Sequence, residues 1–258
     1  MPRSDIDQEL VDAAEAGAAA KVSALLAEGA DPMRDSSSAL RSAVAYGHAE
    51  CLRLLLPVSD AKTEKSEALW LAASSGHAAC VRLLLPVSDA KARESLALRL
   101  AARNGHVECV RLLLPASDPM SEDSCALRVA ARNGHVACLR LLMPVSDPTD
   151  RDSEALRLAA ENGHGECARL LIPESGQLCE MDGLLENVMK LGQVRVAALL
   201  IEAEPRLIDG VDLSKCLAEA LTEGRGDLAS YLSAIMDQRE LGGVAPSAAR
   251  RRQGAARL

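Results

Sequence analysis

Residues 95–118 read Ser-Leu-Ala-Leu-Arg-Leu-Ala-Ala-Arg-Asn-Gly-His-Val-Glu-Cys-Val-Arg-Leu-Leu-Leu-Pro-Ala-Ser-Asp, and similar stretches recur at a spacing of 29 residues. Every histidine of the chain keeps that spacing and directly follows a glycine: His48, His77, His106, His135 and His164. Five cysteines, five prolines and five serines repeat with the same step. A fixed period of this length indicates supersecondary units that stack on one another.

The stretch predicts two short helices joined by a tight turn. Ser95 is suited to cap the first helix, because its hydroxyl group can accept a hydrogen bond from an unpaired backbone N–H. Leu98, Ala101 and Ala102 follow at helical spacing and form one apolar stripe. The Asn-Gly pair at 104–105 ends this helix, since glycine tolerates the positive φ found after many helices.

A second helix is predicted from about Val107 to Leu114, and Pro115 stops it because proline lacks the N–H that another turn would need. Both helices are shorter than the roughly 12–15 residues that an isolated helix needs for marginal stability in water. The pairs must therefore bury their apolar faces against neighbouring pairs, which is the defining property of a solenoid. Alanine and leucine must fill that core, because phenylalanine is absent and aromatic residues make up only 1% of the chain.

The unit resembles the ankyrin repeat. That family carries an Ala-Ala pair, then Gly-His, then a leucine-rich helix and a Gly-Ala-Asp turn. The matching residues are Ala101-Ala102, Gly105-His106, Val110–Leu114 and Asp118, and the first unit has the turn intact at Gly29–Asp31. The resemblance implies an all-α solenoid of ankyrin-type helix-turn-helix repeats.

Two departures from the family pattern bear on the shape of the repeat. The Thr-Pro pair that opens the family's unit is replaced by pairs such as Glu67-Ala68 and Glu154-Ala155. The period of 29 is shorter than the family's usual period of about 33 residues. The missing residues come from the loop after the leucine run, which forms a projecting β-hairpin in family members. Shortened or absent hairpins are therefore expected between the repeats.

About eight repeats are predicted, and together they form an ankyrin repeat domain over residues 1–240. An N-terminal capping repeat, five regular repeats and divergent C-terminal repeats are expected at 5–36, 37–176 and 177–236. Terminal repeats of a solenoid need polar outer faces for solubility. The remaining segment, 241–258, carries four arginines and no acidic residue and is predicted to be a flexible basic tail.

Composition narrows the possible partners and the location of the protein. The formal net charge of −8 argues against a general nucleic-acid binder, whose phosphate affinity requires clustered Lys and Arg. No apolar run approaches the roughly 18 residues of a membrane span, and the acidic N-terminus lacks the apolar core of a signal peptide. The repeat spacing places the register cysteines too far apart for disulfides, which indicates a reducing cytoplasm. The surplus of arginine over lysine is typical of a GC-rich, bacterial genome.

The recurring His-x-x-Cys pair resembles a set of metal ligands, but geometry opposes that interpretation. Stacked helices lie roughly 8–10 Å apart, whereas zinc ligands lie within about 2.3 Å of the ion. In the ankyrin family the histidine instead ties neighbouring turns together, and the cysteine takes an apolar core position. No nucleophile elbow, phosphate loop or metalloprotease motif is present, so no catalysis, cofactor or metal is expected. Three cysteines lie outside the repeat register and leave a reactive thiol as an alternative: Cys125, Cys179 and Cys216.

Ankyrin proteins usually bind their partners on the concave side, which the first helices and the loop tips line. The resemblance therefore implies these candidate partner-binding residues: Tyr46, Trp70, Arg99, Arg103, Arg128, Arg132 and Glu161. Trp, Tyr and Arg are the residues most often found at binding hot spots. Like charges one helical turn apart, as at Arg99 and Arg103, are unfavourable unless they are paired. The arginines are therefore expected to receive an acidic segment of the partner.

The same arginines have a second interpretation, in which they pair with acidic residues of the loops and form an internal network. The acidic residues considered for that network are Glu94, Glu122, Asp123 and Asp152. A second ladder of arginines on the second helices is expected to be a solvated convex face: Arg53, Arg82, Arg111, Arg140 and Arg169.

The sequence thus predicts a monomeric, non-catalytic scaffold or adaptor that binds another protein. Two alternatives within the same class are an immunity-type inhibitor of a toxin and a secreted effector, although an effector would be expected to carry a leader. A nucleic-acid-associated protein that uses Arg250–Arg252 in its tail is a further alternative.

Overall fold

A computed structural model of the protein describes residues 3–58, 62–175 and 183–243, with side chains at 5–34, 37–58, 66–175 and 183–239. The chain divides into two compact units, Met1–Gly176 and Gln177–Leu258. This division falls where the sequence changes from regular to divergent repeats.

The described part of the first unit consists of six helix pairs. In chain order the helices are α1 (Arg3–Glu15), α2 (Ala19–Ala27), α3 (Arg34–Ala45), α4 (Ala49–Leu55), α5 (Lys62–Ser75), α6 (Ala78–Leu84), α7 (Ala92–Arg103), α8 (Val107–Leu113), α9 (Ser121–Arg132), α10 (Val136–Leu142), α11 (Asp150–Glu161) and α12 (Gly165–Leu171). Short 3-10 turns follow three of the second helices: η1 (Leu85–Val87), η2 (Met143–Val145) and η3 (Ile172–Glu174). A proline occupies an early position in each of these turns, as expected for a residue that stops the preceding helix.

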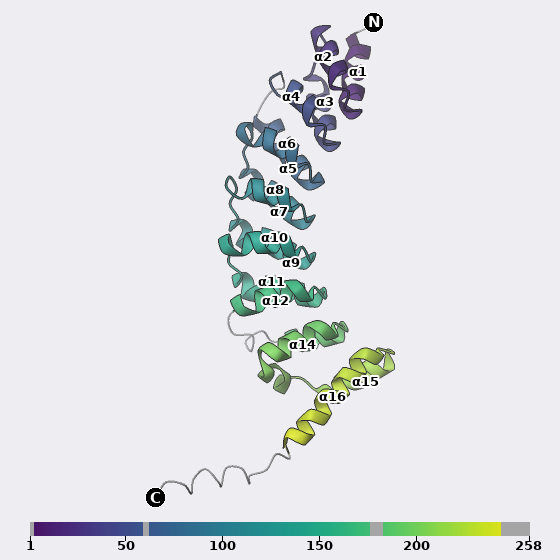
Figure 1. The fold of residues 1–258 in the computed structure, drawn as a ribbon, viewed down its shortest axis with the longest axis vertical. Helices are drawn as coiled ribbons and strands as arrows, with labels where there is room; N and C mark the ends of the chain where they lie inside the picture. Colours follow the sequence, from purple (N-terminus) through teal and green to yellow (C-terminus); the bar gives the residue numbers. More distant parts are fainter. Residues whose placement is uncertain (1–2, 59–61, 176–182, 244–258) are drawn as a thin grey trace, which may run out of the picture. The chain divides into compact units, whose positions relative to one another are not determined.

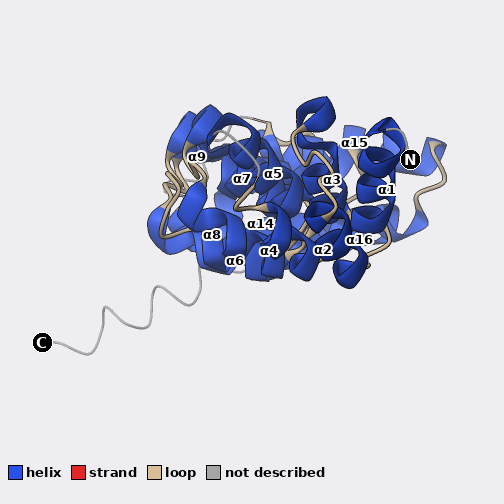
Figure 2. Cartoon of the chain, turned by 90° about the horizontal axis from the view of Figure 1, so that it is seen from above, coloured by secondary structure: helices blue, strands red, loops and turns tan. Residues whose placement is uncertain are grey.

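The helix pairs of the first unit stack so that equivalent helices lie side by side (Figure 1). Each odd-numbered helix from α1 to α11 contacts the next odd-numbered helix, and these helices form the first-helix row. The even-numbered helices from α2 to α12 contact one another in the same way and form the second-helix row. Figure 2 shows the two rows as separate layers, and it shows no strand in the described part of the chain. The predicted all-α ankyrin-type solenoid is confirmed.

Leucine and alanine fill the core between the two rows. In the repeat that spans residues 95–118, the predicted apolar stripe of Leu98, Ala101 and Ala102 is fully buried. Cys109 and Leu113 from the second helix are buried with it. Burying a leucine side chain stabilises a protein by about 1.5–3 kcal/mol, so these contacts make a short helix stable that would not form alone.

The predicted capping role of Ser95 is wrong. Residues 93–95 adopt a left-handed turn, with φ values of 49°, 57° and 57°, before the right-handed part of α7 begins. The Ser95 hydroxyl oxygen accepts a hydrogen bond from the backbone N–H of Asp118, in the connection to the next repeat, at 2.8 Å. Ser124 accepts from Asp147 in the same way, at 3.0 Å. The recurring serine therefore fastens one repeat to the connection that follows it.

The recurring histidines also join neighbouring repeats, as the resemblance implied. The His135 Nε2 lies 2.9 Å from the carbonyl oxygen of Arg103, one repeat earlier. A carbonyl oxygen can only accept, so this nitrogen carries the hydrogen. Equivalent contacts are made by His48 to Glu15, His77 to Ala45 and His106 to Ser74. Each of these four histidines thus satisfies a carbonyl group that the end of the preceding first helix leaves unpaired.

The second unit contains two further helix pairs in its described part. The pairs are α13 (Leu184–Lys190) with α14 (Val194–Ala203), and α15 (Leu213–Thr222) with α16 (Gly226–Gly243), with the 3-10 helix η5 (Pro205–Gly210) between them. Asp212 caps α15 by accepting a hydrogen bond from the backbone N–H of Lys215 at 3.0 Å. The helix α16 extends into the first residues of the predicted tail, and 244–258 lie outside the described residues.

None of the helices described in 3–58, 62–175 and 183–243 combines the length and the apolar character that a bilayer crossing requires.

Candidate functional site: the first-helix row

The seven residues predicted to bind a partner all belong to the first-helix row of the first unit. Tyr46 directly follows α3 and Trp70 lies within α5. The remaining residues lie on the next three helices, with Arg99 and Arg103 on α7, Arg128 and Arg132 on α9, and Glu161 at the end of α11. The fold therefore places these side chains on one row, but their environments differ.

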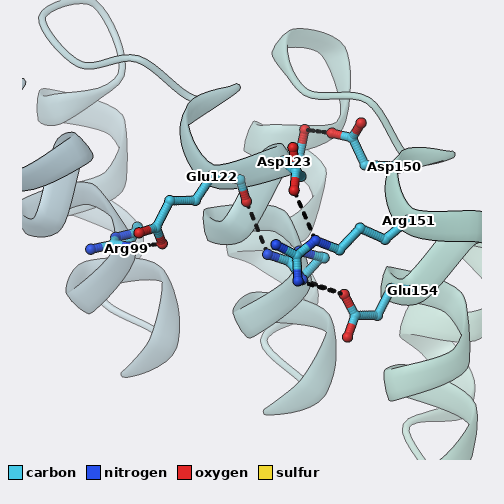
Figure 3. A network of polar contacts seen from close by, with 8 residues as sticks. Arg99, Glu122, Asp123, Asp150, Arg151 and Glu154 are labelled. Carbon is cyan, nitrogen blue, oxygen red and sulfur yellow. Dashed lines mark hydrogen bonds and ion pairs between the residues drawn. The ribbon is translucent and has the colours of Figure 1, made fainter.

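Arg99 and Arg128 are engaged by acidic residues of the following repeat. The Arg99 guanidinium forms an ion pair with Glu122 (Figure 3). The Arg128 guanidinium forms one with Glu154. Arg128 also donates a hydrogen bond to the backbone carbonyl oxygen of Glu122 at 2.9 Å. Only 10% of the Arg128 side chain is exposed, so water screens this pair weakly. These two arginines hold α7, α9 and α11 together.

Arg151 extends the same network along the left-handed turns. Its Nε donates a hydrogen bond to Asp123 at 2.8 Å, and its guanidinium lies 3.9 Å from the Glu154 carboxylate (Figure 3). The Asp123 hydrogen bond raises the pKa of Arg151 above its usual value. Arg151 therefore stays charged and links the turns of two successive repeats.

This network agrees in part with the second interpretation of these arginines, in which they pair with acidic residues of the loops. Glu122 and Asp123 take part in it, as that interpretation expected. Neither Glu94 nor Asp152 forms an ion pair with the described side chains. Glu154 was not among the acidic residues expected in the network. Its signal in the sequence is its position in the next repeat, three residues before Arg157. Stacking brings that position against the arginine of the preceding repeat.

Arg103 and Arg132 have a different environment. Both are the last residues of their helices, both are exposed, and neither forms an ion pair with a described side chain. Adjacent packed helices lie about 8–10 Å apart, so the two guanidinium groups form a pair of cations on neighbouring repeats. Arg157 on α11 is likewise exposed and outside the ion pairs of the described residues.

The flanking candidates differ from the arginines in their contacts. Tyr46 is 55% exposed, and its ring stacks on His48 with the ring centres 6.3 Å apart. A hydrogen bond to the Glu15 carboxylate raises the pKa of the Tyr46 hydroxyl group above its usual value. Glu161, in contrast, is half-buried and lies outside the ion pairs of the described residues. Tyr46 thus presents a neutral aromatic ring at the N-terminal end of the row.

A pocket of about 340 Å³ opens beside Trp70, between α5 and α7. Its walls are largely apolar and include Leu96 and Ala97, while Glu67 and Arg93 form part of its lining. The Trp70 indole Nε1–H is buried and has no hydrogen-bond acceptor among the described residues. A buried N–H without an acceptor is unfavourable, and the same holds for the Nε groups of Arg99 and Arg128 in this row.

The cysteines of the repeat register belong to the core. Burial raises the pKa of the Cys80, Cys109 and Cys167 thiol groups to about 11, so they are protonated at neutral pH. Thiolates are the reactive form, and these groups are therefore poor nucleophiles. Cys179 lies outside the described residues. Within the described ranges, no three or more His, Cys, Asp and Glu side chains are grouped so that they could hold a metal ion.

Comparison with protein families assigns this architecture. The family model "Ankyrin repeats (3 copies)" matches residues 10–95, 58–123 and 98–182, which together span more than half of the chain. The protein belongs to the ankyrin repeat family. Repeats of this family generally serve as modules of protein–protein interaction and are typically non-catalytic.

A solved structure supports the same fold. The chain is similar to the ankyrin repeat domain of human ASB11, with a TM-score of 0.65 and 24% sequence identity over 76% of this chain and 97% of that domain. At this level of identity the likeness concerns the fold alone. No curated protein matches the sequence.

Proposed function

We propose that the protein is a non-catalytic scaffold or adaptor that binds an acidic segment of a partner protein on the first-helix row. The observation that carries this proposal is the contrast between two sets of arginines on the same helices. Arg99 and Arg128 are neutralised by internal ion pairs, whereas Arg103 and Arg132 are exposed and outside the ion pairs of the described residues. Unpaired cations on adjacent repeats attract a complementary acidic segment and orient it.

The second-helix row is a poorer candidate for the same role. Three of its arginines form ion pairs with a glutamate three residues earlier, at distances of 3.4, 3.4 and 3.8 Å: Arg53 with Glu50, Arg111 with Glu108 and Arg169 with Glu166. These charges are therefore partly compensated. Arg82 and Arg140 have alanine in place of that glutamate, at positions 79 and 137. Arg82 lies 3.9 Å from Glu108 of the next repeat instead, and Arg140 is therefore the exception. It is exposed and forms no ion pair with a described side chain.

The state of the cysteines supports a reducing location such as the cytoplasm. Every described cysteine is a free thiol, and those of the register are buried. Disulfides are rare in the cytosol, where thiols are kept reduced. A partner is therefore expected to meet the protein in that compartment.

Charge reversal at the two unpaired arginines tests the proposed function. The double variant Arg103→Glu with Arg132→Glu is expected to reduce capture of the partner from the native host by at least about tenfold, because attraction becomes repulsion. The measurement is quantitative mass spectrometry of proteins that co-purify with each variant. Arg140→Glu is the matched control, since it reverses an equally exposed charge on the second-helix row. Equal capture by the double variant and by the wild-type protein would contradict the proposal.

A further inference from the structure

One position of the first-helix row holds arginine in every regular repeat except one. At steps of 29 residues this position holds Arg41, Trp70, Arg99, Arg128 and Arg157. Trp70 is the only tryptophan of the protein and the only member of the series that is not arginine. In the neighbouring repeats Arg99 and Arg128 form ion pairs with the next repeat, and tryptophan cannot form such a pair.

In the two repeats that follow Trp70, the arginine forms an ion pair with an acidic residue of the next repeat. Arg99 contacts Glu122, and Arg128 contacts Glu154. The residues that occupy the corresponding places opposite Trp70 are Arg93, 29 residues before Glu122, and Leu96, two periods before Glu154. The acidic residue is thus absent at both places, and the space that the ion pair would fill is the pocket of about 340 Å³.

The pocket combines an apolar interior with a polar rim. Trp70, Leu96 and Ala97 line it, and Arg93 forms an ion pair with Glu67 across 3.6 Å. The Arg93 side chain is 65% exposed, so this pair lies in solvent and stabilises little. The interior therefore favours an apolar group.

The volume fits a side chain better than a cofactor. Pockets for drug-sized ligands range from about 300 to 1,000 Å³, and this one lies at the lower end of that range. Tryptophan in a partly open pocket is also the residue most typical of an interaction hot spot. A protruding apolar side chain of a partner protein therefore matches both the size and the lining.

Arg103 lies on α7, the helix that contributes Leu96 to the pocket wall. It offers a second contact to a partner that occupies the pocket. It follows Leu96 by seven residues, which corresponds to about 10 Å along an α-helix. An extended chain covers that distance in about three residues, or four once the side chains are allowed for. A segment whose apolar residue enters the pocket can therefore place a carboxylate three or four residues away against Arg103.

We infer that the pocket beside Trp70 receives an apolar side chain of an extended partner segment, which carries an acidic residue three or four positions away that pairs with Arg103. This inference rests on the proposed function and adds the chemistry of the partner. The occupant is a protein segment, because its contacts alternate between an apolar pocket and a cation at the spacing of a polypeptide chain.

The experiment selects random twelve-residue peptides by display against the full-length protein and titrates the most enriched peptide. The selected peptides are expected to share an apolar residue and an acidic residue three or four positions apart. Because Trp70 is the only tryptophan, its fluorescence reports on the pocket directly, and its emission is expected to shift as the peptide binds. Peptides without the apolar residue, or binding that leaves the emission unchanged, would overturn the inference.

A variant that fills the pocket with an internal ion pair, here called the ladder-closing variant, provides the matched test. Trp70→Arg with Leu96→Glu recreates the Arg128–Glu154 arrangement of a neighbouring repeat and fills the pocket with an internal pair. Peptide affinity, measured by calorimetry, is expected to fall at least about 30-fold, while the helical circular dichroism signal is unchanged. Trp70→Ala, which keeps the pocket open, serves as the second variant if the first fails to fold, and is expected to lose about tenfold.

Comparison with the charge-reversal variant separates the two proposals. If Arg103→Glu with Arg132→Glu abolishes peptide binding and the ladder-closing variant binds normally, the pocket inference is wrong and the proposed function stands. If neither variant weakens binding, both are wrong. If both variants weaken binding, and alanine in place of the peptide's apolar residue costs affinity in the wild-type protein but not in the ladder-closing variant, the pocket inference is supported.

Discussion

Gly105→Ala is expected to lower the free energy of unfolding of the first unit by about 2–4 kcal/mol. Gly105 adopts a φ of +77°, a left-handed conformation that disfavours any residue with a Cβ atom. A Cβ atom there would lie 2.6 Å from His135 Nδ1 of the next repeat. The imidazole would have to move and would lose its hydrogen bond to the carbonyl oxygen of Arg103. Urea denaturation followed by circular dichroism measures the effect.

Two controls separate the backbone contribution from the contact with His135. Gly29 also has a positive φ, +92°, but a Cβ atom there meets nothing within 4 Å, so Gly29→Ala is expected to cost about 1 kcal/mol. In a His135→Ala background, Gly105→Ala is expected to cost about as little as Gly29→Ala. An equally large effect of Gly105→Ala with and without His135 would show that the imidazole contact does not couple the repeats.

Glu154→Gln is expected to destabilise the first unit by about 2–3 kcal/mol, because it leaves the Arg128 guanidinium without its carboxylate partner. The side chains of Arg128 and Glu154 are only 10% and 23% exposed, so water compensates the lost interaction poorly. Glutamine keeps the size of the side chain, and the effect therefore reports on charge rather than on packing. The measurement is the midpoint and slope of urea denaturation.

The matched control for that prediction is Glu50→Gln. Glu50 pairs with Arg53 on the second-helix row at 3.4 Å, but both side chains are more than 60% exposed. Its substitution is expected to change stability by less than about 0.5 kcal/mol. In addition, replacing both members of the pair, by Arg128→Met with Glu154→Leu, is expected to restore most of the stability that Glu154→Gln loses. An effect of Glu154→Gln no larger than that of Glu50→Gln would mean that the network does not join the repeats.

The repeat period was enough to predict most of the fold. Gly105, His135 and Cys109 recur at fixed steps, and a residue type that recurs in this way must meet the same environment in every unit. The period therefore predicted the helix pairs and the core positions, and the resemblance to the ankyrin family implied the link between the histidines and the neighbouring turns. The bounds of the second helix agree with the structure to within one residue, because Pro115 and its equivalents mark its end in each repeat.

The environments within the first-helix row could not be predicted in the same way. The period identifies equivalent residues but not which residues of the next repeat face them. The left-handed turn at 93–95 and its equivalents decide which residues of the next repeat face a given position. Three successive non-glycine residues with positive φ have no recognised sequence signal, so the turn could not be predicted. This turn brings Glu122 against Arg99 and directs the Ser95 hydroxyl group toward the next connection. The sequence offered internal pairing as one of two interpretations of the arginines, but the partners of Arg128 and the open pocket at Trp70 followed only from the structure.

Cross-linking from defined positions tests most directly whether the first-helix row is the recognition face. A photoreactive amino acid in place of Arg132, at the end of α9, is compared with the same amino acid in place of Arg140, on α10. Both sites are exposed and lie in the same repeat, but on opposite rows. After irradiation in the native host, a covalent adduct with a partner protein is expected from position 132 and not from position 140. Adducts that form only from position 140 would contradict the account.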